Sequence, residues 1–258
     1  MKMFLAISDD SALWPHFVRY YHQLGVSEFF VATLATTPRL PEVREDVVVR
    51  TFPRLPPDDM HMGAHPVTFA LRKEFAGPRE WHWLADLDEF HELDRPLDRL
   101  LAEADAMGCN TVAGRFVDRI TRDGSLPPIG DEDLFAQFPV ECDITHKLLG
   151  GISRKLQLIR GHLAPLVAYH SLQGERPFPR EMRVHHFKWN ASVLSRLTTR
   201  VRQEKQNGWP HWGESKRFMS HVEVHGRINV DAIRRLQVGV APLRPVTDPP
   251  LPAAAAGA

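Results

Sequence analysis

The sequence WHWLADLDEF at residues 81–90 is the clearest guide to the fold. Residues 81–85 are an apolar run of the kind that forms a buried strand, and the carboxylates of Asp86, Asp88 and Glu89 follow at once. In an open α/β sheet, ligands bind at the carboxyl ends of the strands. The stretch therefore predicts a buried strand that ends at a binding site.

Strand and helix patterns alternate on both sides of this segment. Further strands are expected at residues 3–7, 29–32, 47–49, 111–118, 155–160, 167–170 and 184–187. Helices are expected at residues 11–25, 67–75, 94–108, 193–206, 214–225 and 230–238, with a long loop or short helices over residues 126–151. Gly63 and Pro66 argue against a helix just before residue 67. The alternation predicts an α/β fold with a mostly parallel sheet flanked by helices, and a helical C-terminal third.

Length and composition point to a globular chain. With 258 residues and 43% hydrophobic residues, the protein can bury a substantial core, and we expect one domain over residues 1–240. Residues 241–258 are rich in Pro and Ala and predict a disordered tail. No apolar run is long enough to span a bilayer, and Asp9 and Asp10 interrupt the N-terminal apolar run before it reaches signal-peptide length. We expect a cytoplasmic protein.

Charge and missing motifs exclude several classes of protein. Lys and Arg total 32 and Asp and Glu total 32, so there is no basic surplus of the kind that binds nucleic acid. The glycine-rich motifs of P-loop and dinucleotide-binding proteins are absent, as is the G-x-S-x-G nucleophile elbow. His221 is followed by Val222 rather than Glu, so the H-E-x-x-H zinc site is absent too.

The acidic residues after the apolar run indicate a metal site. Asp86 and Asp88 are two residues apart, so in an extended chain both side chains lie on one face and reach the same cation. Charges this close repel one another without a counter-ion. Carboxylate oxygens suit Mg²⁺ or Mn²⁺, and substrate phosphates usually complete the coordination of such ions. The expected cofactor is therefore Mn²⁺ or Mg²⁺.

Histidines and one lysine extend this hypothesis. His170 ends an expected short strand, and His185 and His186 are neighbours in another, where successive side chains point to opposite faces. One of that pair should therefore point inward and the other outward. Any of the three imidazoles could complete the coordination of the ion. Lys155 opens a strand and is the candidate contact for a diphosphate.

Taken in order, three segments resemble a known family. They are residues 13–26 (LWPHFVRYYHQLGV), the D-L-D-E-F motif at residues 86–90, and the block of residues 155–170 followed by VHHFK at residues 184–188. Together they resemble the nucleotide-diphospho-sugar glycosyltransferases of the GT-A fold, family 2 in the broad sense, and most of all the branch related to family 92. The resemblance covers roughly residues 3–225. It implies a hexosyltransferase-like enzyme that moves a sugar from a nucleoside diphosphate to an acceptor hydroxyl with inversion.

The resemblance also implies roles for particular residues. Asp88 and His186 would bind the metal, and Asp86, Lys155 and His170 would contact the nucleotide sugar. The loop after the second expected strand lacks the acid usual in family 2, and Asp9 could reach the nucleoside in its place. An inverting transfer needs a base for the acceptor hydroxyl. The expected base is Asp118, and the alternatives are Glu141 and Asp143.

Two other classes of function stay open. The same carboxylates and histidines could serve a metal-dependent phosphoesterase or nucleotidyltransferase, which needs more bridging ligands than the sequence offers. The chain could also be a non-catalytic domain that holds a nucleotide or a glycan. Turnover of a nucleotide sugar would separate the transferase from the binding domain. The donor sugar, the nucleobase and the acceptor are not determined by the sequence.

Overall fold

The computed structural model describes residues 1–7, 12–33, 40, 44–53, 60–167, 169–206, 208 and 212–236. The chain divides into two compact units, each with its own cluster of buried apolar residues. Unit 1 comprises residues 1–116 and 154–185, and unit 2 comprises residues 117–153 and 186–258. The tail expected at residues 241–258 lies outside the described residues.

Unit 1 is built on a mixed sheet. Its elements are β1 (Lys2–Ile7), α1 (Trp14–Gln23), β2 (Glu28–Thr33), β3 (Val48–Pro53), α2 (Met60–Phe75), β4 (Trp81–Leu84), β5 (Glu89–Glu92), α3 (Leu97–Ala106), β6 (Thr111–Ile120), β8 (Arg154–Arg160), β9 (Pro165–Val167), β10 (Ser171–Leu172) and β11 (Met182–His186). The strand order is β3-β2-β1-β4-β8-β6-β11-β5, and β9 and β10 form a separate antiparallel pair. The ends of β6 and β11 belong to unit 2.

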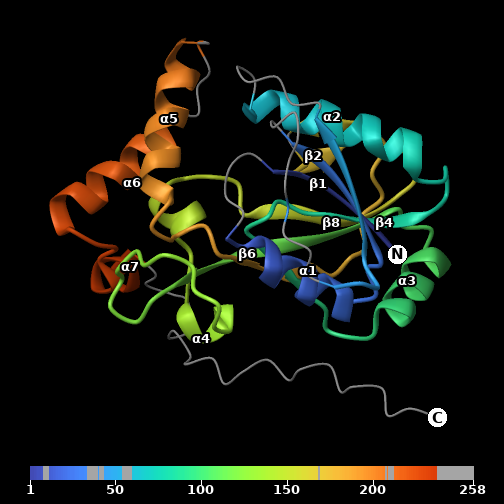
Figure 1. The fold of residues 1–258 in the computed structure, drawn as a ribbon, viewed down its shortest axis with the longest axis horizontal. Coiled ribbons are helices and arrows are strands. Elements are labelled where there is room, and N and C mark those ends of the chain that lie inside the picture. The colour runs from blue at the N-terminus through green and yellow to red at the C-terminus, as the bar shows by residue number, and fades with distance from the viewer. Residues whose placement is uncertain are drawn as a thin grey trace. The chain divides into compact units, whose positions relative to one another are not determined.

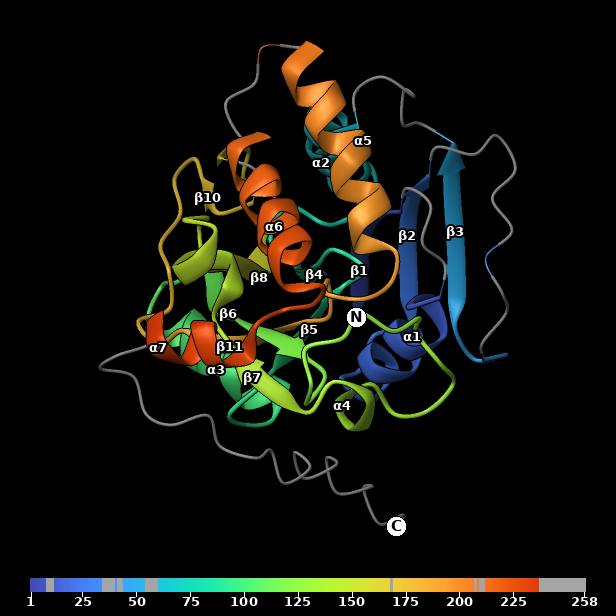
Figure 2. The same cartoon turned by 90° about the vertical axis from the view of Figure 1, so that its left-hand side faces the viewer.

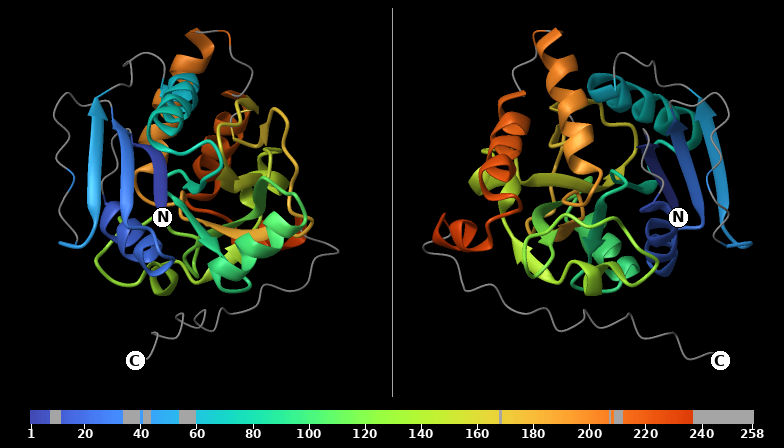
Figure 3. Two further views of the ribbon diagram at one scale, coloured as in Figure 1. Left: turned by 90° about the vertical axis from the view of Figure 1, so that its right-hand side faces the viewer. Right: turned by 60° about the vertical axis from the view of Figure 1, so that its left-hand side comes forward.

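The parallel part of the sheet consists of β3, β2, β1 and β4. Figure 3 shows β1, β2 and β3 as neighbouring blue strands. Beyond β4 the pairing becomes antiparallel, from β4 to β8 and from β8 to β6. The α/β class with a sheet flanked by helices is therefore confirmed. The antiparallel pairing was not foreseen, because it joins strands that are distant in the sequence.

Alternating aromatic residues place helices on both faces of the sheet. Phe29 packs against Trp14 and Phe17 of α1, with ring centroids 5.8 and 6.2 Å away. Its neighbour Phe30 points to the other face, where it contacts Phe75 of α2 at 4.9 Å. Successive strand residues face opposite sides, so α1 and α2 cover opposite faces of β2 (Figure 1).

Two local expectations were wrong. Helix α2 begins at Met60 and includes Pro66, although proline removes one helical hydrogen bond. The packing of Leu71 and Phe75 in the core of unit 1 offsets that loss. Of the strand expected at residues 167–170, Val167 is the last residue of β9, whereas Tyr169 and His170 lie in a turn before β10, and residue 168 lies outside the described residues.

Unit 2 contains the end of β6 together with α4 (Leu134–Gln137), β7 (Val140–Cys142), the π-helical turn η1 (Ile144–Leu148), α5 (Val193–Gln206), α6 (Trp212–His225) and α7 (Val230–Leu236). Helices α5 and α6 pack side by side (Figure 2). The ring of Trp189 lies 4.3 Å from that of Phe218 in the core of this unit. A turn closes at Gly124, whose N–H donates to the carbonyl of Thr121 at 3.2 Å and whose φ is +76°. No helix among the described residues is long and apolar enough to cross a membrane.

Candidate functional site

The acidic residues after β4 form a tight turn in unit 1. The backbone N–H of Glu89 donates to the carbonyl of Asp86 at 3.0 Å, and the N–H of Asp86 donates to Oε2 of Glu89 at 3.0 Å. Leu87 is buried, whereas Asp86 and Asp88 are partly exposed on either side of it. The extended conformation assumed for this segment is therefore wrong, because two reciprocal hydrogen bonds close the chain into an acidic turn, residues 86–89.

Lys155 of β8 lies against this acidic turn. Its Nζ is 2.6 Å from Oδ2 of Asp86 and 2.8 Å from Oε1 of Glu89. The side chains of Lys155 and Glu89 are only 6% and 2% exposed, whereas that of Asp86 is 49% exposed. The structure thus brings together Asp86 and Lys155, two of the residues predicted to contact the donor. An ammonium group held by two carboxylates is fixed in position and stays charged.

A β-bulge lies two residues beyond Lys155. Val112 pairs with Leu158 and Ala113 pairs with Leu156, so Gln157 is the extra residue of β8. The side-chain amide of Gln157 donates to the carbonyl of Arg183 at 3.2 Å, which fixes the bulge. Bulges redirect side chains and are common beside active sites. The bulge thus sets the direction in which the start of β8 presents its side chains.

Burial and charge shift the pKa values of the two buried partners. Burial, together with the negative charges of Asp86 and Asp88, raises the pKa of Glu89 from 4.5 to about 7, although Lys155 acts in the opposite direction. Burial alone would lower the pKa of Lys155, but the charges and hydrogen bonds of Asp86 and Glu89 raise it. The turn therefore holds one permanent positive charge and a carboxyl that gains or loses its proton near neutral pH.

The carboxylates of this turn suit a hard divalent cation. Lys155 forms ion pairs with Asp86 and Glu89, but its Nζ is not within ion-pair distance of either oxygen of Asp88. Asp88 lies at the partly exposed rim of the turn. Mg²⁺-type ions are commonly held by one or two carboxylates together with substrate phosphates and water. Within the described ranges, no group of three or more His, Cys, Asp and Glu side chains is arranged to hold a metal ion. A Mn²⁺ or Mg²⁺ ion at this turn therefore stays a prediction.

Two buried residues behind the turn were missed by the sequence analysis. Glu89 was predicted only as one of the acidic residues after the strand. Its position between the end of a strand and the apolar Phe90 is the pattern that indicates its burial. The hydroxyl of Tyr21 donates to the carbonyl of Glu89 at 2.9 Å and accepts from the N–H of His91 at 3.3 Å. Tyr21 lies on the buried face of α1 and is fully buried, so it ties the helix to the acidic turn.

His170 lies in the turn between β9 and β10, in the same unit. Its Nδ1 donates to the carbonyl of Arg154, and the Arg154 guanidinium donates to the carbonyl of His170. Burial and the positive charge of Lys155 lower the pKa of His170, so the imidazole is neutral at pH 7. His170 is thus held next to the start of β8, where Lys155 projects towards the acidic turn.

Asp118 lies in unit 2 and is completely buried. Its Oδ1 accepts hydrogen bonds from Thr145 Oγ1, His186 Nδ1 and Trp189 Nε1, each at 2.8 Å, and its Oδ2 accepts from the N–H of Thr145 at 2.6 Å. Burial alone would raise the pKa of Asp118, but these hydrogen bonds and the His186 ring hold it below its ordinary value. Such a carboxylate is a weak proton acceptor with no face open to substrate, so the geometry does not suit the predicted base.

The adjacent histidines have separate carboxylate partners. His185 Nε2 donates to Oε2 of Glu92 at 2.8 Å, and His186 Nδ1 donates to Oδ1 of Asp118 at 2.8 Å. The two side chains point to opposite faces of β11, as expected, but both are buried, so the expectation that one would face outward is wrong. Asp118 contacts the His186 ring through Nδ1 and not through Nε2. The predicted role of His186 as a metal ligand stays a prediction.

The two alternative bases, Glu141 and Asp143, make contacts within unit 2. Glu141 accepts from the Arg119 guanidinium at 3.1 Å, and Asp143 caps η1 by accepting from the N–H of His146 at 3.2 Å. Both alternatives to Asp118 therefore already have a structural partner. Asp9 lies outside the described residues.

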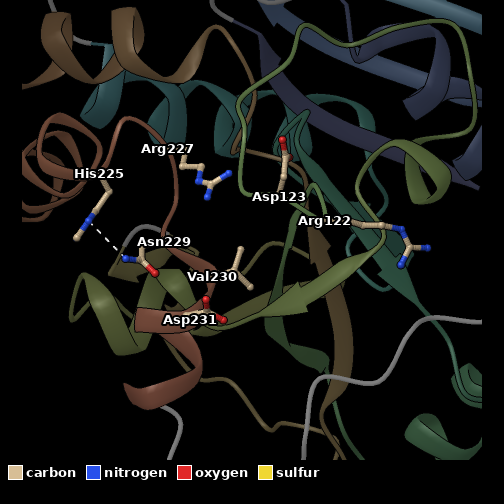
Figure 4. A pocket seen from close by; sticks show the side chains of 7 residues that line it. All are labelled: Arg122, Asp123, His225, Arg227, Asn229, Val230 and Asp231. Atoms are coloured by element: carbon tan, nitrogen blue, oxygen red, sulfur yellow. Dashed lines mark hydrogen bonds between the residues drawn. The ribbon is translucent and has the colours of Figure 1, made fainter.

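Unit 2 also contains a polar hollow of about 500 Å³ (Figure 4). Asn229 uses its Oδ1 to cap α7 and its Nδ2 to contact His225 Nδ1 at 3.4 Å. Charged side chains of both signs line the rest of it, and none of the predicted site residues takes part. The lining residues are Arg122, Asp123, His225, Arg227, Asn229, Val230 and Asp231.

Comparison with protein-family models and with curated proteins gives no match.

Proposed function

We propose that the protein is a metal-dependent glycosyltransferase of the GT-A class, which moves a sugar from a nucleoside diphosphate to an acceptor hydroxyl with inversion. The observation that supports this most strongly is the acidic turn at the carboxyl end of the parallel strand β4, with the buried Lys155 against it. Ligands of α/β sheets bind at such strand ends. Carboxylates and a fixed ammonium group in one place suit a metal-diphosphate substrate.

Each residue of the turn has a distinct part in this proposal. Asp88, at the partly exposed rim, would hold Mn²⁺ or Mg²⁺ with the donor's phosphate oxygens, and the ion would stabilise the negative charge of the leaving diphosphate. Asp86 is partly exposed and would contact the ribose or the waters around the ion. Lys155 would contribute positive charge to the diphosphate while keeping Glu89 and Asp86 in place.

A nucleotide-binding domain without turnover is the second candidate. The observation that favours it is the state of Asp118, which is buried and accepts four hydrogen bonds. Among the described residues, Glu141 and Asp143 are likewise engaged in structural contacts. The described part of the chain thus leaves the base for the acceptor hydroxyl unassigned.

The test is turnover of nucleotide sugars with Mn²⁺ and with EDTA, measured as release of the nucleoside diphosphate. The transferase predicts release from one donor that depends on Mn²⁺ and rises when a suitable acceptor is added. Binding of the donor without release would favour the second candidate. Neither binding nor release with any donor would contradict both.

A further inference from the structure

Tyr169 has an unusual backbone conformation beside the candidate site. Its φ is +39°, and no other non-glycine residue in the described part of the chain has a positive φ. A bulky side chain in this left-handed region is strained and persists only where surrounding contacts hold it. Strain of this kind is concentrated at functional sites. The contacts of Tyr169 therefore need an explanation beyond ordinary packing.

Helix α2 supplies those contacts. The Tyr169 ring is 2% exposed in the core of unit 1, and its hydroxyl lies 2.5 Å from Oγ1 of Thr68. The guanidinium carbon of Arg72 lies 5.9 Å from the centre of the same ring. Arg72 is itself fully buried and donates to His82 Nε2 at 2.8 Å and to the carbonyl of Gly161 at 3.2 Å. Two neighbouring turns of α2 thus anchor the side chain of Tyr169.

The backbone of Tyr169 is fixed as well. Its carbonyl accepts from the N–H of Leu156 in β8 at 3.1 Å. The next residue, His170, exchanges two hydrogen bonds with Arg154, one from each residue to the carbonyl of the other. Arg154 and Leu156 flank Lys155, so Tyr169 and His170 are joined to β8 on both sides of the lysine that contacts the acidic turn.

The hydrogen bond to Arg154 shows which tautomer of His170 is present. A carbonyl only accepts, so Nδ1 of His170 is the nitrogen that carries the proton. Because the ring is neutral, Nε2 has a free lone pair. No described residue hydrogen-bonds to Nε2. Nε2 is accessible to solvent, since it is not one of the buried polar atoms that lack a partner. Nε2 is therefore available to accept a hydrogen bond from a ligand.

We propose that Tyr169 is a positioning residue, whose left-handed backbone, anchored by Thr68 and Arg72, holds His170 in the Nδ1–H tautomer so that Nε2 accepts a hydrogen bond from a hydroxyl group of the nucleotide sugar. The tautomer and its anchoring follow from the contacts of unit 1 alone. Only the identity of the ligand rests on the proposed function.

Nitrogen-15 NMR of the histidine rings tests the anchoring directly. In the full-length protein, the His170 signal, assigned by its loss in His170→Gln, should show the Nδ1–H tautomer. Tyr169→Phe and the isosteric Thr68→Val remove the hydroxyl contact, so both should convert His170 to a mixture of tautomers. Thr68→Ser restores the hydroxyl and should restore the wild-type signal. Tyr20→Phe, which loses a different hydroxyl contact to the carbonyl of His91, is the matched control and should leave His170 unchanged.

An Nε2–H tautomer in the wild type would overturn the proposal. So would a His170 signal that is the same in Tyr169→Phe, Thr68→Val and the wild type, since a merely structural tyrosine has no reason to change the tautomer.

Calorimetric titration with UDP, GDP and ADP in the presence of Mn²⁺ tests the ligand. Tyr169→Phe and Thr68→Val should weaken the binding of whichever nucleotide the wild type binds by about three- to tenfold, and Thr68→Ser and Tyr20→Phe should not. Unchanged affinity in the first two variants would overturn the role of Nε2 in binding. If the wild type binds none of the nucleotides, the proposed function fails and the assigned ligand fails with it, while the NMR result still decides whether Tyr169 positions His170.

Discussion

At the scale of single residues, the candidate site depends on one buried lysine that contacts two carboxylates. Lys155 cannot be removed without leaving Glu89 buried and unpaired, and the loss of one partner from a buried ion pair usually costs about 3–5 kcal/mol. Glu89 in turn changes its proton content near neutral pH. The protonation of Glu89 therefore connects the stability of unit 1 with pH.

The first prediction concerns the pH dependence caused by Glu89. Its pKa is about 7 in the folded protein and 4.5 ordinarily, so the folded state binds the proton more tightly. The contribution of Glu89 to the free energy of unfolding should therefore be fully present below pH 4.5 and fall by up to about 3 kcal/mol as pH rises to 7. Urea unfolding at several pH values should show this fall for the wild type but not for Glu89→Gln.

The control for this prediction is Glu45→Gln, because Glu45 is exposed and should leave the pH profile of the wild type unchanged. A difference in unfolding free energy between the wild type and Glu89→Gln that stays constant from pH 5 to pH 8 would contradict the assignment to Glu89.

The second prediction concerns Asp118. In Asp118→Asn, the amide NH₂ group takes the place of one carboxylate oxygen and cannot accept a hydrogen bond. In the position of Oδ2 it faces the N–H donor of Thr145, and in the position of Oδ1 it faces three donors. A buried donor without an acceptor costs about 1–3 kcal/mol, so the free energy of unfolding should fall by that amount. Urea unfolding measures it, with the exposed Asp131→Asn as control. Unchanged stability together with lost transfer would instead restore Asp118 as the base.

Residue by residue, the sequence located the acidic turn and Lys155 but not their pairing. That pairing arises because β8 lies antiparallel to β4, a contact between segments about seventy positions apart. The burial of Asp118 was not predicted for a similar reason, since its partners Thr145 and Trp189 come from distant segments that the local pattern does not place. Burial of a charged residue is decided by such tertiary contacts, which single-sequence patterns do not contain.

At the scale of elements, the bulge in β8 connects the sheet with the site. A Cβ atom on Gly114, the β6 residue paired with Lys155, would lie 2.0 Å from Nε2 of Gln157 and 2.7 Å from Cγ2 of Val184. Glycine at this position therefore leaves room for the side-chain amide of Gln157, which donates to the carbonyl of Arg183 beside the bulge.

The third prediction follows from this close contact. Gly114→Ala should lower the free energy of unfolding by about 1–3 kcal/mol, the usual cost of inserting a methyl group into a well-packed interior. Thermal and urea unfolding measure the change. Gly77→Ala is the matched control, because its added Cβ would come no closer than 3.5 Å to its neighbours. If both variants were equally stable, Gly114 would not be the residue that makes room for the side-chain amide of Gln157.

Apolar periodicity predicted most elements because the segments in question are buried. Strands β1, β2, β4 and β8 are largely buried, and α1 has its buried residues on one face. β5 was missed because it begins with a carboxylate and has only four residues. The predicted start of α2 at residue 67 is too late. The prediction counted the hydrogen bond lost at Pro66 but not the stabilisation from the packing of Leu71 and Phe75 in the core.

At the scale of the whole molecule, the chain comprises two compact units, and the acidic turn, Lys155 and His170 all belong to unit 1. His186, the other predicted metal ligand, belongs to unit 2, and its function stays a prediction. The central claim of the proposed function therefore concerns unit 1 first: the acidic turn binds a nucleoside diphosphate together with a divalent cation.

The most direct test is calorimetric titration of the full chain with UDP, GDP and ADP, each with and without Mn²⁺. We predict that one nucleotide binds only with Mn²⁺ and that Asp88→Asn weakens this binding at least about tenfold, a loss of about 1.4 kcal/mol, at unchanged melting temperature. The exposed Asp98→Asn should bind as the wild type does. Binding that is equally strong without Mn²⁺ or in Asp88→Asn, or no binding at all, would contradict a metal-dependent nucleotide site at the acidic turn.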